Sequence, residues 1–240
     1  MVPSQARADT REKIVEQAAR LLQEEGPGAL TTRGVAVAAG VQAPTIYRLF
    51  GDKDGLLDAV TEHVLATYVS TKAAADRTAG DADVDPLADL RAGWRTQTDF
   101  GVANPSLFAL LSDPDRARRS PAAQAGMRVL ATKVHRLALA GLLRVPESRA
   151  VELVHAAGTG AVLTILATPP AERDLTVADD MLEAVLAHVL AAPEQPASAG
   201  AGWAAAAVTL RAAAPGLEAL SGAERELLSE WLERAVGRER

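Results

Sequence analysis

Three cationic side chains fall within one short stretch of the sequence, TTRGVAVAAGVQAPTIYRLFGDK, which runs from Thr31 to Lys53. The cations are Arg33, Arg48 and Lys53, and Asp52 is the only acidic residue in the stretch. Guanidinium and ammonium groups are the usual side-chain partners of phosphate oxygens. The stretch therefore marks a candidate phosphate-binding site in a chain whose formal net charge is -6.

The distribution of charge places any nucleic-acid-binding face near the N-terminus. Residues 1–55 carry seven Lys or Arg and seven Asp or Glu, whereas the remaining residues carry 18 and 24 and so hold all of the net negative charge. A polyanion is attracted to a local basic patch rather than to the average charge of a chain. We expect a local contact with double-stranded DNA and no general affinity for polyanions.

The composition is that of a soluble protein. The 240 residues, 48% of them apolar, suffice for a hydrophobic core in one domain or two. The absence of cysteine removes disulfides and thiolate chemistry. We find no apolar run of about 18 residues that predicts a membrane-spanning helix, and the polar N-terminus lacks a signal-peptide pattern. We expect a cytoplasmic protein with no membrane contact.

Motifs for enzyme chemistry are weak. Glu152 and His155 have the Glu-x-x-His spacing that supplies ligands in di-iron helical bundles, but the other histidines have no glutamate three residues before them. Gly158-Thr-Gly160 lacks the third glycine and the preceding strand of a nucleotide-binding loop. We expect no enzyme activity, no catalytic residue, no metal and no cofactor, and a di-iron enzyme is kept as a remote alternative.

The sequence predicts an all-α fold. Alanine and leucine dominate, and apolar residues recur at helical spacing rather than alternating. A first helix ends at Gly26-Pro27, Thr31 caps a second helix that Gly40 stops, and Pro44 falls in the first turn of a third.

Beyond residue 55 the pattern predicts a fourth helix, a polar loop at 73–85 and five further helical segments. A linker at 191–202 then precedes two amphipathic pieces, at 203–214 and 223–236.

Two short helices joined through Gly40 and Val41 form the pattern of a helix-turn-helix. In that unit the second helix enters the major groove by its N-terminal residues. The small or polar residues at that position are Gln42, Ala43, Pro44 and Thr45. Tyr47 and Arg48 would lie along the flank, near phosphate oxygens. Lys53 begins the next helix, where its ammonium and the free backbone N–H groups would meet the same phosphate.

The opposite face of the third helix is apolar and is predicted to pack on the first two helices. The residues concerned are Ile46, Leu49 and Phe50, facing Ile14, Leu22 and Val35. The alternative interpretation is a purely structural helix-glycine-helix unit, in which Arg48 and Lys53 are ordinary solvated charges.

The segment LTTRGVAVAAGVQAPTIYRLFGDKDGLLDAV resembles the DNA-binding domain of the TetR (tetracycline-repressor) family nearly end to end. The shared elements are the Thr-Thr-Arg start, the Ala-x-x-Ala-Gly-Val turn, the Thr-x-Tyr-x-x-Phe helix and the lysine that follows. They extend over roughly residues 9–60. The resemblance implies a three-helix N-terminal helix-turn-helix domain that binds a palindromic operator.

The resemblance also implies roles for individual residues. Contacts with phosphate or the groove edge would come from Thr32, Gln42 and Tyr47. Arg33 and Thr45 would each reach a base or a phosphate, and Lys53 a phosphate. Ala43 and Leu49 occupy positions where relatives often carry longer polar side chains, so the operator sequence is not predicted.

The family's second domain is a helical bundle for ligand binding and dimerisation, which the resemblance places at residues 56–192. Its last two helices, here about 148–167 and 176–192, would form the dimer interface. The small residues of HAAGTGAVLTIL independently favour close helix approach. The predicted interface residues are Ala157, Gly158, Ala161, Ile165, Leu182, Val185 and Val189. The alternative is that these side chains pack inside one subunit.

Candidate ligand contacts fall on or beside inward faces of the core helices, and the alternative for each is ordinary core packing. They are Trp94, Thr98, Phe108, Met127, His135 and His155. An apolar pocket with few polar groups suits a hydrophobic or aromatic compound.

We therefore predict three parts: a helix-turn-helix domain at 1–55, a helical ligand-binding and dimerisation domain at 56–192, and a linker with a C-terminal helical extension at 193–240. The expected function is that of a homodimeric transcriptional regulator, a repressor released from its operator by a small-molecule effector. The alternative is a DNA-binding regulator controlled by a protein partner.

Overall fold

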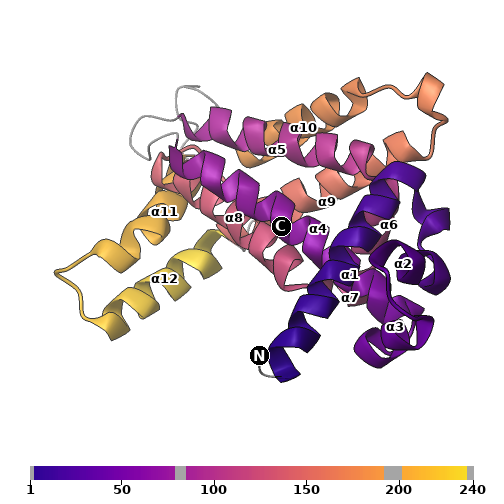
Figure 1. Cartoon of the computed structure of the whole chain (residues 1–240). Coiled ribbons are helices and arrows are strands. Elements are labelled where there is room, and N and C mark those ends of the chain that lie inside the picture. Colours follow the sequence, from indigo (N-terminus) through magenta and orange to yellow (C-terminus); the bar gives the residue numbers. More distant parts are fainter. Residues whose placement is uncertain (1–2, 79–84, 192–201, 237–240) are drawn as a thin grey trace. The chain divides into compact units, whose positions relative to one another are not determined.

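A computed structural model describes residues 3–78, 85–191 and 202–236 (Figure 1). The described residues form α-helices, three short 3-10 turns and the connections between them, and they contain no β-strand beyond one isolated bridge between Leu143 and Leu190. The predicted all-α class is confirmed. The chain divides into two compact units, each with its own core.

The N-terminal unit comprises residues 1–79 and 103–126. Its helices are α1 (Pro3–Glu25), α2 (Thr32–Ala39), α3 (Ala43–Phe50), α4 (Lys53–Thr78), α6 (Pro105–Leu111) and α7 (Pro114–Arg119). This division differs from the predicted boundary at residue 55, because α4 packs against α1, α3 and α6 and so belongs with them.

The core of the N-terminal unit holds the two short helices in place. Ile14 of α1, Val35 of α2 and Ile46 of α3 are all 0% exposed, and they share one cluster with Leu56 of α4. The packing predicted for the inner face of the third helix is confirmed, since Leu49 and Phe50 also lie against this cluster. The position of α3 is therefore fixed by burial of its apolar face.

Two elements of this unit differ from the prediction. Helix α4 continues to Thr78, into the predicted polar loop at 73–85, most of whose remaining residues lie outside the described part. Helix α7 was not predicted. It begins because the Asp113 carboxylate accepts hydrogen bonds from the N–H groups of Asp115 and Arg116, both at 2.9 Å, and Pro114 occupies its first position. These backbone hydrogen bonds lower the pKa of Asp113.

The C-terminal unit comprises residues 80–102 and 127–240. It holds most of α5 (Pro86–Ala103) and of α8 (Pro121–Leu139), and all described residues of α9 (Glu147–Leu166), α10 (Thr176–Val189), α11 (Gly202–Ala213) and α12 (Gly222–Val236). α9 packs along α10, and α11 pairs with α12 as a hairpin (Figure 1).

The C-terminal extension is part of the fold of this unit. Val208 and Ala212 of α11 are 2% and 6% exposed and belong to the same cluster as Leu137 and Val189. The predicted linker at 191–202 falls almost entirely outside the described residues. The extension predicted as a separate part at 193–240 thus supplies core residues, because one face of α11 is apolar.

Within the described ranges, α9 is the one helix long and apolar enough to cross a membrane by length and composition. Of its most apolar window, 33% is buried inside the protein. Val154, Val162 and Ile165 are among the residues it buries. Core helices of soluble proteins have the same composition, so this feature alone is weak evidence for a membrane.

Candidate nucleic-acid interface

The turn between α2 and α3 is built by local hydrogen bonds. At the start of α2, the Thr31 hydroxyl accepts the Gly34 N–H at 2.9 Å. At its end, Gly40 has φ 67° and ψ 36°, a left-handed conformation in which glycine has no steric penalty. The Val41 N–H then donates to the Ala36 carbonyl at 2.9 Å. These contacts set the angle at which α3 leaves the turn.

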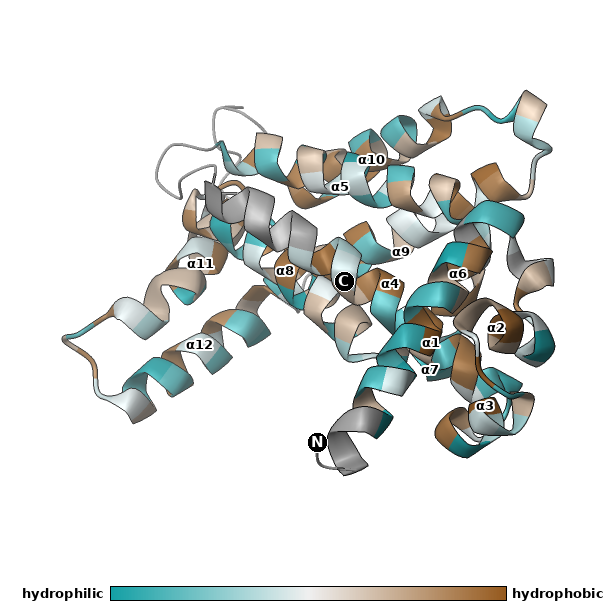
Figure 2. Ribbon diagram, in the orientation of Figure 1, coloured by the Kyte–Doolittle hydropathy of each residue, from teal (hydrophilic) through white to brown (hydrophobic). Residues whose placement is uncertain are grey.

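Helix α3 presents a polar face opposite its buried Ile46. Gln42, Pro44 and Arg48 are exposed, and Tyr47 is 52% exposed. Figure 2 shows both hydrophobic and hydrophilic residues on this short helix. Ala43 and Thr45, also predicted to face the groove, are half-buried. The structure thus brings the predicted reading residues together at the N-terminal end and outer face of α3.

One hydrogen bond joins the outer faces of the two helices. The hydroxyls of Thr32 on α2 and Tyr47 on α3 lie 3.3 Å apart. Arg33, the next residue along α2, is exposed. Thr32, Arg33 and Tyr47 therefore form a polar edge to which both helices contribute.

The start of α4 is closely packed against the end of α3. The Asp52 carboxylate accepts the Gly55 N–H at 2.8 Å and so caps α4 directly before Lys53, which is exposed. The prediction of free backbone N–H groups at this terminus is therefore wrong for Gly55. A Cβ on Gly55 would lie 2.1 Å from the Phe50 carbonyl oxygen, so this close approach requires glycine.

Two features of this region were missed from sequence. Val37 on α2 is 76% exposed, the highest value among the exposed large apolar residues. It follows the exposed Arg33 by four residues and lies on the same side of the helix. Asp52 also places a carboxylate next to the candidate phosphate ligand Lys53. The capping role of Asp52 is predictable, because an aspartate three residues before Gly55 at a helix start is a frequent N-cap.

Comparison with known proteins identifies the domain. Residues 14–60 match the model of bacterial regulatory proteins of the tetR family. The tetracycline repressor protein class D of Escherichia coli is 40% identical over 58 residues, which are 24% of this chain and 27% of that relative. The regulator BetI of Burkholderia mallei is 27% identical over 187 residues, covering 74% of this chain and 93% of that protein.

The N-terminal domain, over residues 14–60, is a DNA-binding domain of the TetR family. A solved TetR-family structure, FadR of Thermus thermophilus in complex with lauroyl-CoA, is 23% identical with a TM-score of 0.59 and covers 79% of this chain and 100% of that one. This likeness supports the fold. The stretch shared with the tetracycline repressor is about a quarter of each protein.

The predicted ligand residues are divided between the two units. Trp94 and Thr98 of α5 are buried in the C-terminal unit at 5% and 8% exposure. His155 of α9 and the half-buried Met127 of α8 also belong to that unit. Phe108 of α6 is buried in the N-terminal unit.

The polar partners of these residues differ. The Thr98 hydroxyl donates to backbone carbonyls of its own helix, whereas the buried Trp94 indole N–H has no acceptor among the described residues. His135 pairs through Nδ1 with Glu147 at 3.0 Å. His155 is exposed at the surface, yet desolvation by its neighbours lowers its pKa. An indole N–H left without an acceptor is the strongest indication of a ligand in this set.

The Glu-x-x-His pair does not assemble a metal site within the described residues. Glu152 is exposed and pairs with Arg149 at 3.2 Å. Among those residues, no group of three or more His, Asp or Glu side chains is placed to hold an ion.

The structure corrects most of the predicted dimer-interface residues. Gly158 faces inward, since a Cβ there would lie 3.3 Å from the Trp94 ring. The other inward-facing members are Ala161, Ile165, Leu182 and Val189, at 1–3% exposure, while Ala157 and Val185 are half-buried. Helix α9 carries small residues on more than one face, and the face chosen from sequence is the one that packs inside the subunit.

Proposed function

We propose that this chain is a homodimeric transcriptional repressor that binds a palindromic operator and is released from it by a small molecule. The supporting observation is the helix-turn-helix of α2 and α3, which lies within the residues 14–60 that match the TetR family model and which presents an exposed polar face on α3. The activity of the whole chain is inferred from this unit together with the family.

In the proposed complex the N-terminal end of α3 enters the major groove. Gln42, Pro44 and Thr45 approach base edges, while Tyr47 and Arg48 lie toward the phosphates on the flank. Lys53 at the start of α4 and Arg33 on α2 extend the phosphate contact. Gln42 and Thr45 are the hydrogen-bonding side chains nearest the groove, so direct base recognition is limited, and DNA shape would contribute to specificity.

Dimerisation through α9 and α10 is supported by the face that these helices leave exposed. Leu163 on α9 and Met181 on α10 are 41% and 40% exposed. Around them lie the small exposed residues Ala156, Gly160 and Ala184. On α9 the positions Ala156, Gly160 and Leu163 follow the helical repeat, so they form one stripe. Two copies of such a face pack as a four-helix bundle across a two-fold axis.

Control by a small molecule is supported by the buried Trp94 N–H, which lacks an acceptor in the described structure. A compound with a hydrogen-bond acceptor and an apolar body would satisfy this group. FadR of Thermus thermophilus, a relative by fold, was solved with lauroyl-CoA. The effector would act by favouring a dimer geometry in which the two α3 helices no longer match successive major grooves.

Control by a protein partner is the second candidate, because the C-terminal hairpin exposes large apolar side chains. Trp203, Leu210, Leu227 and Trp231 are each at least 40% exposed. A partner protein would cover them. Under this alternative, the purified protein releases DNA when a protein fraction is added, and no compound from a small-molecule screen releases it.

DNA binding is tested by fluorescence anisotropy on a duplex enriched by selection from random DNA. Arg48→Ala removes a proposed phosphate contact, and Arg20→Ala removes an arginine of α1 that is also exposed. We expect the first to weaken binding by about tenfold and the second by much less. Equal effects of the two changes would show that only overall charge matters.

The dimer face is tested by sedimentation. Leu163→Glu places a charge on the proposed interface, and Leu210→Glu places one on an equally exposed leucine of α11 (41% and 43%). We expect Leu163→Glu to give monomers and Leu210→Glu to leave the dimer intact. If Leu210→Glu gave monomers and Leu163→Glu remained a dimer, the interface would have to be assigned to the C-terminal hairpin instead.

A further inference from the structure

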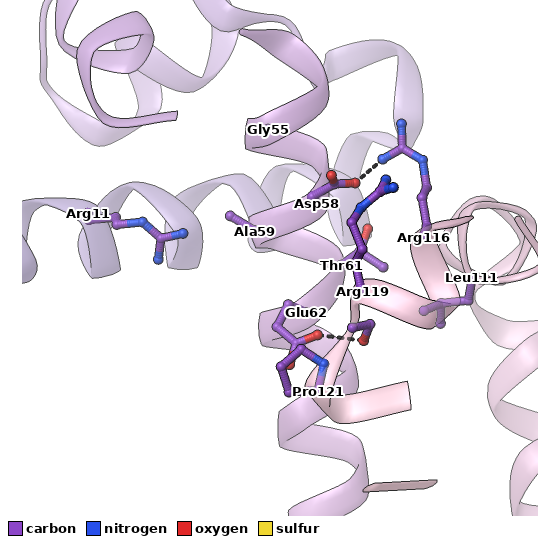
Figure 3. Close-up of a pocket in the computed structure, with 11 residues that line it drawn as sticks. Arg11, Gly55, Asp58, Ala59, Thr61, Glu62, Leu111, Arg116, Arg119 and Pro121 are labelled. Atoms are coloured by element: carbon purple, nitrogen blue, oxygen red, sulfur yellow. Dashed lines mark hydrogen bonds and ion pairs between the residues drawn. The ribbon is translucent and has the colours of Figure 1, made fainter. Parts of the chain in front are cut away.

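A cleft in the N-terminal unit, formed by residues of α1, α4 and α7, is lined by groups that bind anions. It has a volume of about 340 Å³. Arg11 reaches it from α1 on one side, and Arg116 and Arg119 reach it from α7 on the other, with α4 between them (Figure 3). A volume of this size is at the lower end of the range for small-molecule sites.

The two carboxylates that line the cleft already have partners. Arg116 donates to Asp58 and, at 3.2 Å, to Asp54. Glu62 accepts the Ser120 hydroxyl at 2.5 Å and the Ala122 N–H at 2.8 Å (Figure 3). Their negative charge is therefore largely compensated within the fold, and they offer little to a cationic ligand.

The donors of the cleft, in contrast, are available. Arg119 is exposed and forms no ion pair with a described carboxylate, having only a weaker attraction to Asp113. Arg11 lies over the Phe50 ring at 5.2 Å, a contact that leaves its N–H groups open. The Thr61 hydroxyl is buried, in a residue with 7% exposure, and it has no hydrogen-bond partner in the described structure.

A buried hydroxyl without a partner is unfavourable, and natural proteins retain few such groups. Thr61 lies on α4 and lines the cleft together with these arginines (Figure 3). An oxyanion in the cleft would accept hydrogen bonds from Thr61 and Arg119 and gain charge from Arg11. Among the described residues that line the cleft, the Thr61 hydroxyl and the Arg119 guanidinium thus both lack an acceptor, and one oxyanion would supply it to both.

We propose that this cleft is an anion-binding site for the phosphate or carboxylate group of a small metabolite. It is a second ligand site, distinct from any ligand of the C-terminal unit. Thr61 and Arg119 bind the oxygens, and Arg116 holds the wall of the cleft by its pairing with Asp58.

The test is calorimetric titration of the purified full chain with sodium phosphate, and separately with sodium acetate, at fixed ionic strength. We expect saturable binding of at least one of the two, which identifies the preferred group. Arg119→Gln and Thr61→Val should each weaken that binding by about tenfold. Arg118→Gln is the matched control, because Arg118 is exposed, pairs with Asp115 and does not line the cleft.

Thermal melting distinguishes a binding hydroxyl from a structural one. Replacing a buried hydroxyl that has no partner by a methyl group should leave the melting temperature of Thr61→Val unchanged or raised. A lower melting temperature would show that the hydroxyl is paired inside the fold and would overturn the proposal.

Three further results would also overturn it. One is the absence of saturable binding of either anion to the unaltered chain. Another is an equal loss of binding in Arg118→Gln and Arg119→Gln, which would indicate general charge. The third is a loss of DNA binding in Arg119→Gln with anion binding unchanged, which would assign Arg119 to the DNA backbone.

Discussion

Replacing Gly55 by alanine tests how tightly α3 is held against α4. Gly55 lies in the first turn of α4 and has no positive φ. Helix propensity alone predicts that alanine stabilises such a position by about 1 kcal/mol. The structure predicts the opposite sign, because the added Cβ would lie 2.1 Å from the Phe50 carbonyl oxygen and 3.2 Å from its carbon.

The magnitude follows from what must move. Ordinary contact begins near 3.4 Å, so the Phe50 carbonyl must shift by more than 1 Å. The clash is between backbone atoms and Cβ, and no rotamer change relieves it. Overpacking costs about 1–3 kcal/mol, and we place this case at the upper end. After subtraction of the propensity gain, the net loss is about 2 kcal/mol, or roughly 8–16 °C in melting temperature for a unit of about 100 residues.

The assay is thermal unfolding of the full chain followed by circular dichroism at a helical wavelength. Gly28→Ala is the matched control, because a Cβ at Gly28 would meet no atom within 4 Å. We expect the control to change stability by less than about 0.5 kcal/mol. If Gly55→Ala melted at or above the temperature of the unaltered chain, the reasoning from the packing of α3 on α4 would be refuted.

Three further predictions concern DNA binding, the extension and pH. Lys53→Ala should weaken binding to operator and random DNA alike, and it should reduce the dependence of log affinity on log salt by about one for each phosphate that is no longer neutralised, whereas Thr45→Ala should cost about 1–3 kcal/mol of binding free energy on the operator alone. Fluorescence anisotropy at several salt concentrations measures both effects. An equal loss of affinity for both DNAs in Thr45→Ala would show that Thr45 contacts phosphate. Val208→Ala should destabilise the chain by about 1.5–3 kcal/mol in urea unfolding, because Val208 is 2% exposed. Leu227 is 42% exposed, so Leu227→Ala should cost less than about 0.5 kcal/mol. Similar losses of unfolding free energy in the two variants would argue against a folded extension. The pKa of His155 is lowered in the folded chain, so the unfolded chain binds the proton of this imidazole more readily. The neutral imidazole therefore contributes its full share of the folding free energy above about pH 6.5, and that share is lost as the pH falls through the folded pKa. His155→Gln should make stability depend less on pH on the acid side, and an unchanged pH dependence would contradict the lowered pKa.

Local signals predicted the helix-turn-helix well. Thr31, Gly40 and Pro44 each act through backbone geometry or capping within a few residues, so their effect is visible in the sequence. The inward face of α3 was also predictable, because Ile46 recurs at helical spacing with Leu49 and Phe50 beside it.

The C-terminal unit was less predictable, since its faces are decided by distant contacts. On α9, Gly158 and Gly160 look equivalent in sequence, yet Gly158 packs on Trp94 and Gly160 is exposed. The buried position of Val208 likewise depends on helices far away along the chain. In the N-terminal unit, the cleft that contains Thr61 and Arg119 brings together residues that are distant in the sequence, so no local pattern predicts the cleft.

The most direct test of DNA recognition by α3 is footprinting of the duplex that the purified chain enriches from random DNA. We predict a palindrome with two protected half-sites one helical turn apart, about 34 Å, or a multiple of that spacing, each contacted by one recognition helix of the dimer. Enrichment of no sequence, or protection of a single asymmetric site by one chain, would contradict it.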